Sequence, residues 1–354
     1  MKRFFVVAQA VLLTVAFNVF SQTLEDRNAV TFEPVYDEPY AVNKLFIGFQ
    51  PLYGELFVAN TNAGFGLEAQ YYLQDKADFK ASFRKTYSSS FFDLNRSLAN
   101  DNSLQDNRSQ VFNYFELGGT WHVRDFEESS STKMVLYRKS YRGNRWASRM
   151  PVSTSVPAKV RKIYGVRAGG FSWAATTDLS GALEAQGLSN ADLKDAEGNS
   201  LPPTVGEGNR EEPLNLYTNI SAANVYLGGS MAWMRNVAVD FDTYEQGVDD
   251  LMLTVFFDLI YAPSINIDDV SFTHSDPNAP ITGRRTYDVS PISLKSFGAR
   301  AGIEGKFNRT FSWAYGAEIG YRPGIEGRTF FALVKVSFPM FGSTLDYKVE
   351  SFQK

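Results

Sequence analysis

Cysteine is absent from this chain of 354 residues. Its absence excludes a disulfide framework, cysteine-ligated zinc, a cysteine nucleophile and the lipid-attachment site of a lipoprotein. Long apolar runs are missing too, because after residue 21 none approaches the roughly 18 residues that a membrane-spanning helix needs. A cell-envelope protein with neither a lipid anchor nor a spanning helix is either soluble or a β-barrel.

Histidine is scarce: the chain has only His122 and His274, which excludes histidine-rich metal sites and catalysis by several histidines. His122 lies in sequence phase with Glu116, and we interpret it as part of a polar network inside the protein. The alternative is a membrane-embedded lipid hydrolase that uses His122, but no spacing selects a partner hydroxyl or acid for it. We therefore predict no enzyme activity, no catalytic residue, no metal site and no cofactor.

The N-terminus, residues 1–21, has the pattern of a secretory signal peptide. A short basic start precedes a mostly apolar stretch at residues 4–20, and we expect cleavage before Gln22. The mature protein would then be exported. Residues 22–43 are rich in acidic side chains, and we interpret them as a periplasmic lead-in. The alternative is a short plug or a partner-binding strap.

Apolar and polar residues alternate with a period of two along much of the chain, which is the pattern of half-buried β-strands. In residues 63–73 Phe65 and Leu67 face one way, while Gly66 and Glu68 face the other. The same alternation returns after short turns in residues 77–87, 297–307, 311–322 and 330–338. These segments predict β-hairpins with one apolar and one polar face.

Aromatic residues make up 15% of the chain, including 18 Tyr and 29 Phe, which is high for a soluble domain. A secreted β-sandwich also alternates, but glycines and charges of both signs recur here on the polar face, as a barrel lumen tolerates. We predict an all-β fold, an antiparallel transmembrane β-barrel at residues 44–341 with a polar lumen and long extracellular loops. Residues 342–354 would be an extension or a final strand.

The strand count is about twelve, an even number as in bacterial barrels. The remaining candidate strands are residues 45–58, 111–124, 133–142, 160–173, 217–234, 237–241 and 251–261. Residues 88–110, 142–158 and 264–294 are expected to be long loops on one side, whereas residues 177–216 break this rule. One more hairpin hidden around residues 215–221 would give about fourteen strands, and the alternative is that residues 237–241 belong to the neighbouring strand, which changes the parity of the count.

The polar faces predict which charged side chains line the lumen. These are Glu68, Lys80, Arg84, Glu116, His122, Arg167, Arg300, Glu304, Glu318, Arg322 and Lys335. A barrel of about twelve strands is narrower than an open porin of 16 to 18 strands, so such residues could fill it.

Acids are missing from residues 129–177, where many bases occur, and residues 178–212 reverse this bias. We predict a basic loop of Arg142, Arg145, Arg149, Lys159, Arg161 and Lys162. It could bind lipopolysaccharide phosphates at the outer rim, or its continuation to Arg167 could attract anions into the lumen. It could also fold against the acidic segment.

The chain resembles the outer-membrane β-barrels of Bacteroidota in style. The resemblance rests on the Phe-rich signal peptide with Gln22 at the expected mature start, and on long aromatic strands such as residues 224–230 and 330–338. It covers most of the mature chain and matches no named subfamily, so it carries over no functional residue. The chain departs from barrels that end on an aromatic residue, because Gln353 and Lys354 follow Phe352.

These patterns predict a protein of the Gram-negative outer membrane, and the leading function is a porin-like channel or transport-associated barrel for small polar solutes. The alternative is a structural barrel of an envelope secretion or motility machine. Expected partners are outer-membrane lipid, including lipopolysaccharide, the barrel-insertion machinery and an envelope protein. No nucleic-acid partner is expected.

Overall fold

The computed structural model describes residues 30–58, 60–73, 76–88, 93–102, 105–139, 152–205, 212–274, 282–309 and 312–343. The predicted signal peptide and the last residues of the predicted C-terminal extension, 344–354, lie outside these ranges. Among the described residues, no helix has the length and apolar character to span a membrane.

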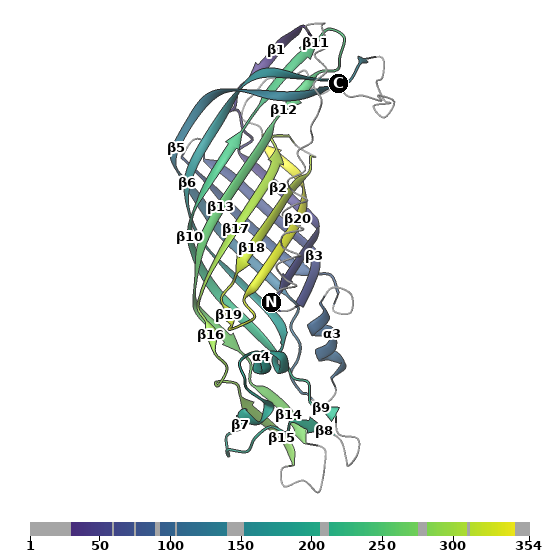
Figure 1. Ribbon diagram of the computed structural model, residues 1–354, viewed down its shortest axis with the longest axis vertical. Helices are drawn as coiled ribbons and strands as arrows, with labels where there is room; N and C mark the ends of the chain where they lie inside the picture. The colour runs from purple at the N-terminus through teal and green to yellow at the C-terminus, as the bar shows by residue number, and fades with distance from the viewer. Residues whose placement is uncertain are drawn as a thin grey trace, which may run out of the picture.

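A closed antiparallel barrel of ten strands forms the body of the described chain (Figure 1). The strands lie in the circular order β10, β13, β17, β18, β20, β2, β3, β4, β5, β6, and β6 closes the circle onto β10. Their bounds are β2 Leu45–Phe57, β3 Asn60–Leu73, β4 Ala77–Thr86, β5 Asn113–Leu136, β6 Val152–Asp178, β10 Tyr217–Met234, β13 Leu251–Ile267, β17 Phe297–Phe307, β18 Ala314–Tyr321 and β20 Phe330–Ser343. The predicted antiparallel barrel is confirmed.

The predicted count of about twelve strands is wrong for two identifiable reasons. Residues 113–124 and 133–136 belong to one long strand, β5, because the alternating pattern does not mark where a strand leaves the barrel. Residues 237–241 form β11 (Val237–Phe241), which lies outside the barrel in a three-stranded sheet with β1 (Phe32–Asp37) and β12 (Gly247–Asp249). Residues 215–221 hide no extra hairpin, because β10 begins at Tyr217.

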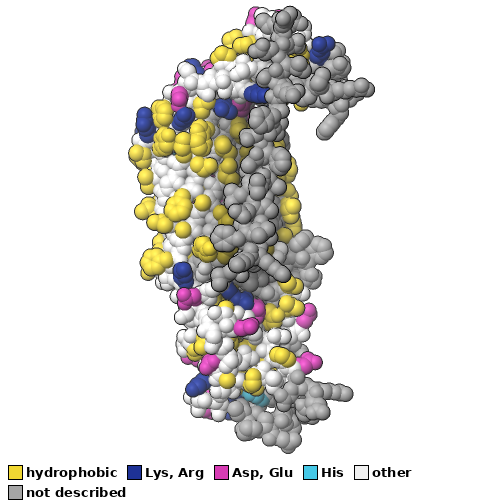
Figure 2. Space-filling model, viewed as in Figure 1, with side chains coloured by type: hydrophobic (Ala, Val, Ile, Leu, Met, Phe, Trp, Pro, Cys, Tyr) yellow, Lys and Arg dark blue, Asp and Glu magenta, His cyan; other side chains and the backbone are white. Residues whose placement is uncertain are grey.

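The predicted alternation sets the two faces of the barrel wall. Large apolar side chains such as Leu67, Leu117 and Leu259 point outward and are exposed, while charged neighbours such as Glu68 and Glu116 point inward. Figure 2 shows apolar side chains spread over the wall and charged side chains gathered beyond both of its margins. An apolar band between two charged margins is the surface of a barrel that faces lipid.

The barrel has a proximal end, where β2 begins and β20 ends, and an opposite distal end (the top and the bottom of Figure 1). Residues 88–110, 177–216 and 264–294 all connect strands at the distal end. Strand β5 ends and β6 begins at the proximal end, where β3 also turns into β4. For the described residues 152–158, the expected placement beside the other long loops is therefore wrong, whereas the described residues 177–205 and 212–216, the expected exception, follow the rule.

A structure that we call the platform extends the proximal end. The paired segments 129–136 of β5 and 152–159 of β6 continue beyond the barrel as a two-stranded ribbon. Met134 and Val156 of the ribbon pack with Val239 and Phe241 of the three-stranded sheet in one buried cluster. Sheet and ribbon thus bury a small apolar core of their own outside the barrel.

Short elements close the distal end: α3 (Leu94–Asp101), α4 (Leu179–Ala185), η3 (Asn190–Asp192), β7 (Lys194–Asp195), β8 (Thr204–Val205), β9 (Glu212–Pro213), β14 (Val270–His274), β15 (Gly283–Asp288), β16 (Leu294–Lys295) and β19 (Gly324–Ile325). Strand β15 pairs with β14 and β7. In this sheet the His274 ring lies 2.6 Å from the Tyr287 hydroxyl. Burial, reinforced by the nearby Arg285, lowers the pKa of His274, which favours the neutral ring.

Candidate functional site: a charged and closed lumen

Apolar clusters fill both ends of the lumen. The distal cluster contains Phe57 and Trp173 of the wall together with Leu179 and Leu183 of α4, all nearly inaccessible to solvent. The smaller proximal cluster consists of Val42, Phe46, Tyr72, Ile163, Ala232, Met234 and Met252. Helix α4 therefore seals one end, and side chains around the rim seal the other.

Arg300 is the centre of an ion-pair network in the middle of the lumen. Its guanidinium lies 2.5 Å from Glu116, 2.9 Å from Asp258 and 3.6 Å from Glu318. Asp258 also accepts from Arg167 at 2.9 Å. All of these side chains are almost fully buried, so the charges compensate one another rather than being hydrated.

A second cluster lies on the distal side of this network and is built around Glu55. Arg322 reaches Glu55 at 2.5 Å, and Arg84 lies 4.0 Å from the same carboxylate. Both guanidiniums stack on aromatic rings, Arg84 3.9 Å from the Tyr114 centroid and Arg322 3.9 Å from the Phe331 centroid. Cation–π contacts of this kind favour a buried guanidinium where hydrogen-bond acceptors are few.

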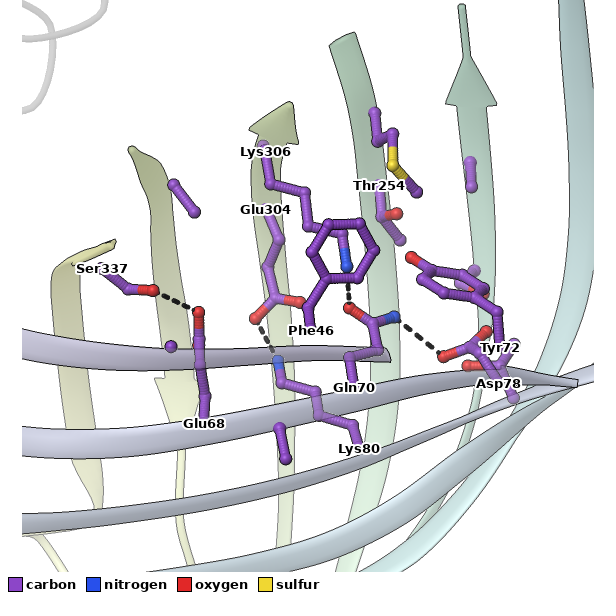
Figure 3. Close-up of a pocket in the computed structure, with 18 of the residues that line it drawn as sticks. Phe46, Glu68, Gln70, Tyr72, Asp78, Lys80, Thr254, Glu304, Lys306 and Ser337 are labelled. Carbon is purple, nitrogen blue, oxygen red and sulfur yellow. Dashed lines mark hydrogen bonds and ion pairs between the residues drawn. The ribbon is translucent and has the colours of Figure 1, made fainter. Parts of the chain in front are cut away.

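On the proximal side, a third network surrounds a cavity of about 70 Å³ (Figure 3). Glu304 accepts from both Lys80 and Lys335, and Lys335 also lies 3.5 Å from Glu68. Ser337 donates to the other oxygen of Glu68. The two lysines and two glutamates of this network balance in charge.

A hydrogen-bonded chain crosses the same cavity closer to the proximal rim. Lys306 donates to the Gln70 side-chain oxygen, and the Gln70 amide donates to Asp78 at 3.1 Å. Asp78 also lies 3.2 Å from His122 Nε2. The Lys306 ammonium lies over the ring of Phe46, 4.3 Å from its centroid. His122 thus has an acidic neighbour, and the hypothesis that it serves lipid hydrolysis stays a prediction.

A segment that we call the strap, residues 38–44, crosses the proximal mouth. The Asn43 amide donates to the Asn308 side chain at 2.8 Å, and Asn308 donates back to the Ala41 carbonyl at 2.6 Å. Asn236 donates to the same carbonyl at 3.1 Å. With Val42 in the proximal apolar cluster, the strap is fastened to two turns of the barrel and covers its mouth.

The structure places every predicted lumen residue on the inner face of the wall: Glu68, Lys80, Arg84, Glu116, His122, Arg167, Arg300, Glu304, Glu318, Arg322 and Lys335. Ten of them meet in the three ion-pair networks, and His122 lies in the hydrogen-bonded network of Lys306, Gln70 and Asp78. Glu55, Asp78, Asp258 and Lys306, which complete these networks, were not among the predicted site residues.

The predicted basic loop is only partly described. Arg142, Arg145 and Arg149 lie outside the described residues, whereas Lys159, Arg161 and Lys162 belong to β6. These three pair with acids on the neighbouring strand: Lys159 with Glu127 at 3.1 Å, Arg161 with Asp125 and Lys162 with Glu128.

The acidic segment 178–212 has different partners, at the other end of the molecule. Asp178 pairs with Arg328, and Asp195 and Glu197 pair with Arg285. For the described residues, the interpretation that the basic tract folds against the acidic segment is therefore wrong. The local reason is strand pairing, which places each of these β5 acids two residues from the register partner of its β6 base.

Comparisons with known proteins identify no family. No family model matches the chain, and no curated protein matches it. One solved structure that the chain resembles is a loop-deletion form of OmpT, an outer membrane protein of Vibrio cholerae, with 8% identity and a TM-score of 0.16 over 84% of this chain and 99% of that one. At that level the likeness carries no argument, and the resemblance to Bacteroidota barrels stays a prediction.

Proposed function

We propose that this protein is an outer-membrane β-barrel with a structural or docking role in the cell envelope rather than an open channel. The observation that carries this proposal is the filled lumen. From the distal end to the proximal rim, an apolar cluster, buried ion pairs, a small cavity and a second apolar cluster follow one another. An open porin leaves an aqueous path instead.

Loop length supports an orientation in that membrane. Bacterial barrels have short periplasmic turns and longer extracellular loops. The long connections that hold α3, α4 and the β14–β15 hairpin all lie at the distal end, which we therefore assign to the cell exterior. The platform and the strap then face the periplasm. In this orientation the described bases of the basic loop do not reach lipopolysaccharide phosphates, and an envelope protein is the partner that we retain.

The platform is the part of the molecule that a lipid-facing wall or a channel does not need. Its ribbon continues β5 and β6 beyond the barrel, and its sheet recruits β1 from the N-terminal lead-in. Such a folded projection with its own apolar core is a surface suited to holding a periplasmic partner.

Removing the ribbon of the platform should leave the barrel intact and abolish the function of the protein. Ser129 and Lys159 are register partners, so a two-residue Asn-Gly turn can join them in place of residues 130–158. Val237, Val239 and Phe241, which this uncovers, would be changed to threonine. We expect heat-modifiable gel migration and membrane insertion as in the wild type, but no complementation of the envelope defect of a deletion strain.

The matched control shortens the distal β14–β15 hairpin between the register partners His274 and Gly283. We expect this variant to complement fully, because the partner is proposed at the opposite end. Full complementation by the variant without the ribbon would contradict the docking role and favour a function of the barrel itself.

A gated channel for small polar solutes is the second candidate, and two observations favour it. The proximal half of the lumen retains a cavity lined by charged side chains, and the strap that covers its mouth is held by the hydrogen bonds of Asn236 and Asn308. Release of such a segment could open the proximal end. The distal cluster and the Arg300 network would still have to rearrange before a solute could pass.

A further inference from the structure

The lumen cavity is a built site to which every barrel strand contributes, from Phe46 of β2 to Ser337 of β20. Its volume is about 70 Å³. Since one water needs roughly 10–15 Å³ of such space, the cavity has room for on the order of five waters or one small organic ion of about four heavy atoms. Figure 3 shows the side chains of Lys306, Gln70 and Lys80 converging on this space.

The carboxylates around the cavity already have cationic or hydrogen-bonding partners. Glu304 pairs with Lys80 and Lys335, Glu68 accepts from Gln50 and Ser337, and Asp78 accepts from Gln70. Arg167, which also lines the cavity, is compensated by Asp258. These acids therefore offer no strong reason for a cationic ligand to enter.

Lys306 is different, because it contacts no carboxylate within ion-pair distance in the described part of the chain. Its one hydrogen bond there goes to the Gln70 oxygen, and its ammonium lies over the rings of Phe46 and Tyr72, 4.3 and 4.8 Å from their centroids. An ammonium has three N–H donors, so two remain to be satisfied at the cavity. The Thr254 and Ser230 side chains add hydroxyls to the same lining.

A second polar atom at the cavity also lacks a partner. His122 lines it, and His122 Nδ1 is buried without a hydrogen bond among the described residues, while Nε2 faces Asp78. The groups with unused hydrogen-bonding capacity at this site are thus the Lys306 ammonium and the His122 ring nitrogen. Buried polar groups of this kind are normally satisfied by a ligand or ordered water.

We propose that the lumen cavity binds one small monoanion, of the size and chemistry of acetate, against the Lys306 ammonium. The rings of Phe46 and Tyr72 that lie against the ammonium belong to the proximal apolar cluster, and the anion would accept hydrogen bonds from the two spare N–H groups. The proposal is independent of the docking role, since a closed structural barrel and a gated channel could both hold such an ion. Because the proximal cluster and the strap cover the cavity, entry would be slow.

Equilibrium dialysis of the folded barrel in detergent against radiolabelled acetate tests the proposal, with incubation long enough for slow entry. We expect saturable binding of one acetate per barrel, and at least a tenfold loss of affinity in Lys306→Gln. The matched control is Lys85→Gln, which removes the same charge from an exposed lysine at the distal end of β4 and should bind as the wild type.

Two further arms identify the ion and guard against misfolding. Competition by chloride would assign the site to small monoanions in general, and a lack of competition would assign it to carboxylates. Lys306→Arg keeps the charge, so it should fold and retain acetate binding even if Lys306→Gln does not fold. Wild-type protein without saturable acetate binding, or folded Lys306→Gln that binds acetate like the wild type, would overturn the proposal.

Discussion

Replacing Arg300 with methionine is expected to lower the free energy of unfolding by about 3–5 kcal/mol, the cost of breaking a buried ion pair from one side. The Arg300 side chain is 1% exposed and faces Glu116, Asp258 and Glu318. Methionine fills a similar volume but leaves these carboxylates with less compensation. Only Asp258 keeps a guanidinium within 3 Å, that of Arg167.

Urea unfolding of the protein in lipid vesicles measures this change. The matched control is Arg284→Met, because the Arg284 side chain is 64% exposed and lies 3.4 Å from Asp106. A surface pair of this kind contributes about 0–1 kcal/mol, so the control should unfold almost as the wild type does. Equal effects of the two substitutions would mean that the lumen is hydrated and that its charges do not depend on one another.

Replacing Leu259 with arginine is expected to lower the free energy of unfolding in lipid by about 2–4 kcal/mol, the cost of a charge near the bilayer midplane. Leu259 is 61% exposed in the middle of β13 and points away from the lumen. Its neighbour Asp258 points inward to Arg300, so the two residues mark the two sides of the wall.

The matched control for Leu259 is Val135→Arg in the platform ribbon. Val135 is 48% exposed, comparable to Leu259, but it lies beyond the end of the barrel. In water the same substitution should change stability by no more than about 0.5 kcal/mol. A large loss at Val135 together with none at Leu259 would contradict the proposed position of the membrane.

The sequence predicted the hairpins because the wall separates two environments at each residue. Lipid on one side and packed charges on the other require apolar and polar residues to alternate, as in residues 63–73 and 297–307. The same reasoning placed Arg300 and Glu304 inside. It did not predict the strand count, because alternation continues along β5 into the ribbon, where the apolar side packs against β11 rather than lipid.

The alternating pattern did not predict two lumen residues, Glu55 and Asp258, and the reason is local in each case. In β2 the inward positions change from Phe46 and Gln50 to Tyr53 and Glu55, because a register shift between Gln50 and Tyr53 adds a residue at Pro51. Asp258 stands alone among the apolar residues of β13. A single acid within such a run was the available signal.

Loop length could not predict at which end of the barrel each loop lies, because one strand boundary was predicted wrongly. Counting residues 133–142 as a separate strand inserted an extra crossing, which put residues 142–158 and 177–216 at the wrong ends. The partners of the ion pairs could not be predicted from the sequence either. The acids that meet Lys159 and Arg161 are more than 30 positions earlier in the sequence, and only the β5–β6 register brings them together.

Planar-bilayer recording of the purified, folded protein tests the closed lumen most directly, with a general porin reconstituted in the same way as the positive control. The filled lumen predicts no stepwise conductance from the wild type under conditions in which the porin gives steps. Heat-modifiable migration of the same sample would show that the silent protein is folded. Reproducible steps from that folded sample would contradict the closed barrel and establish the gated channel in its place.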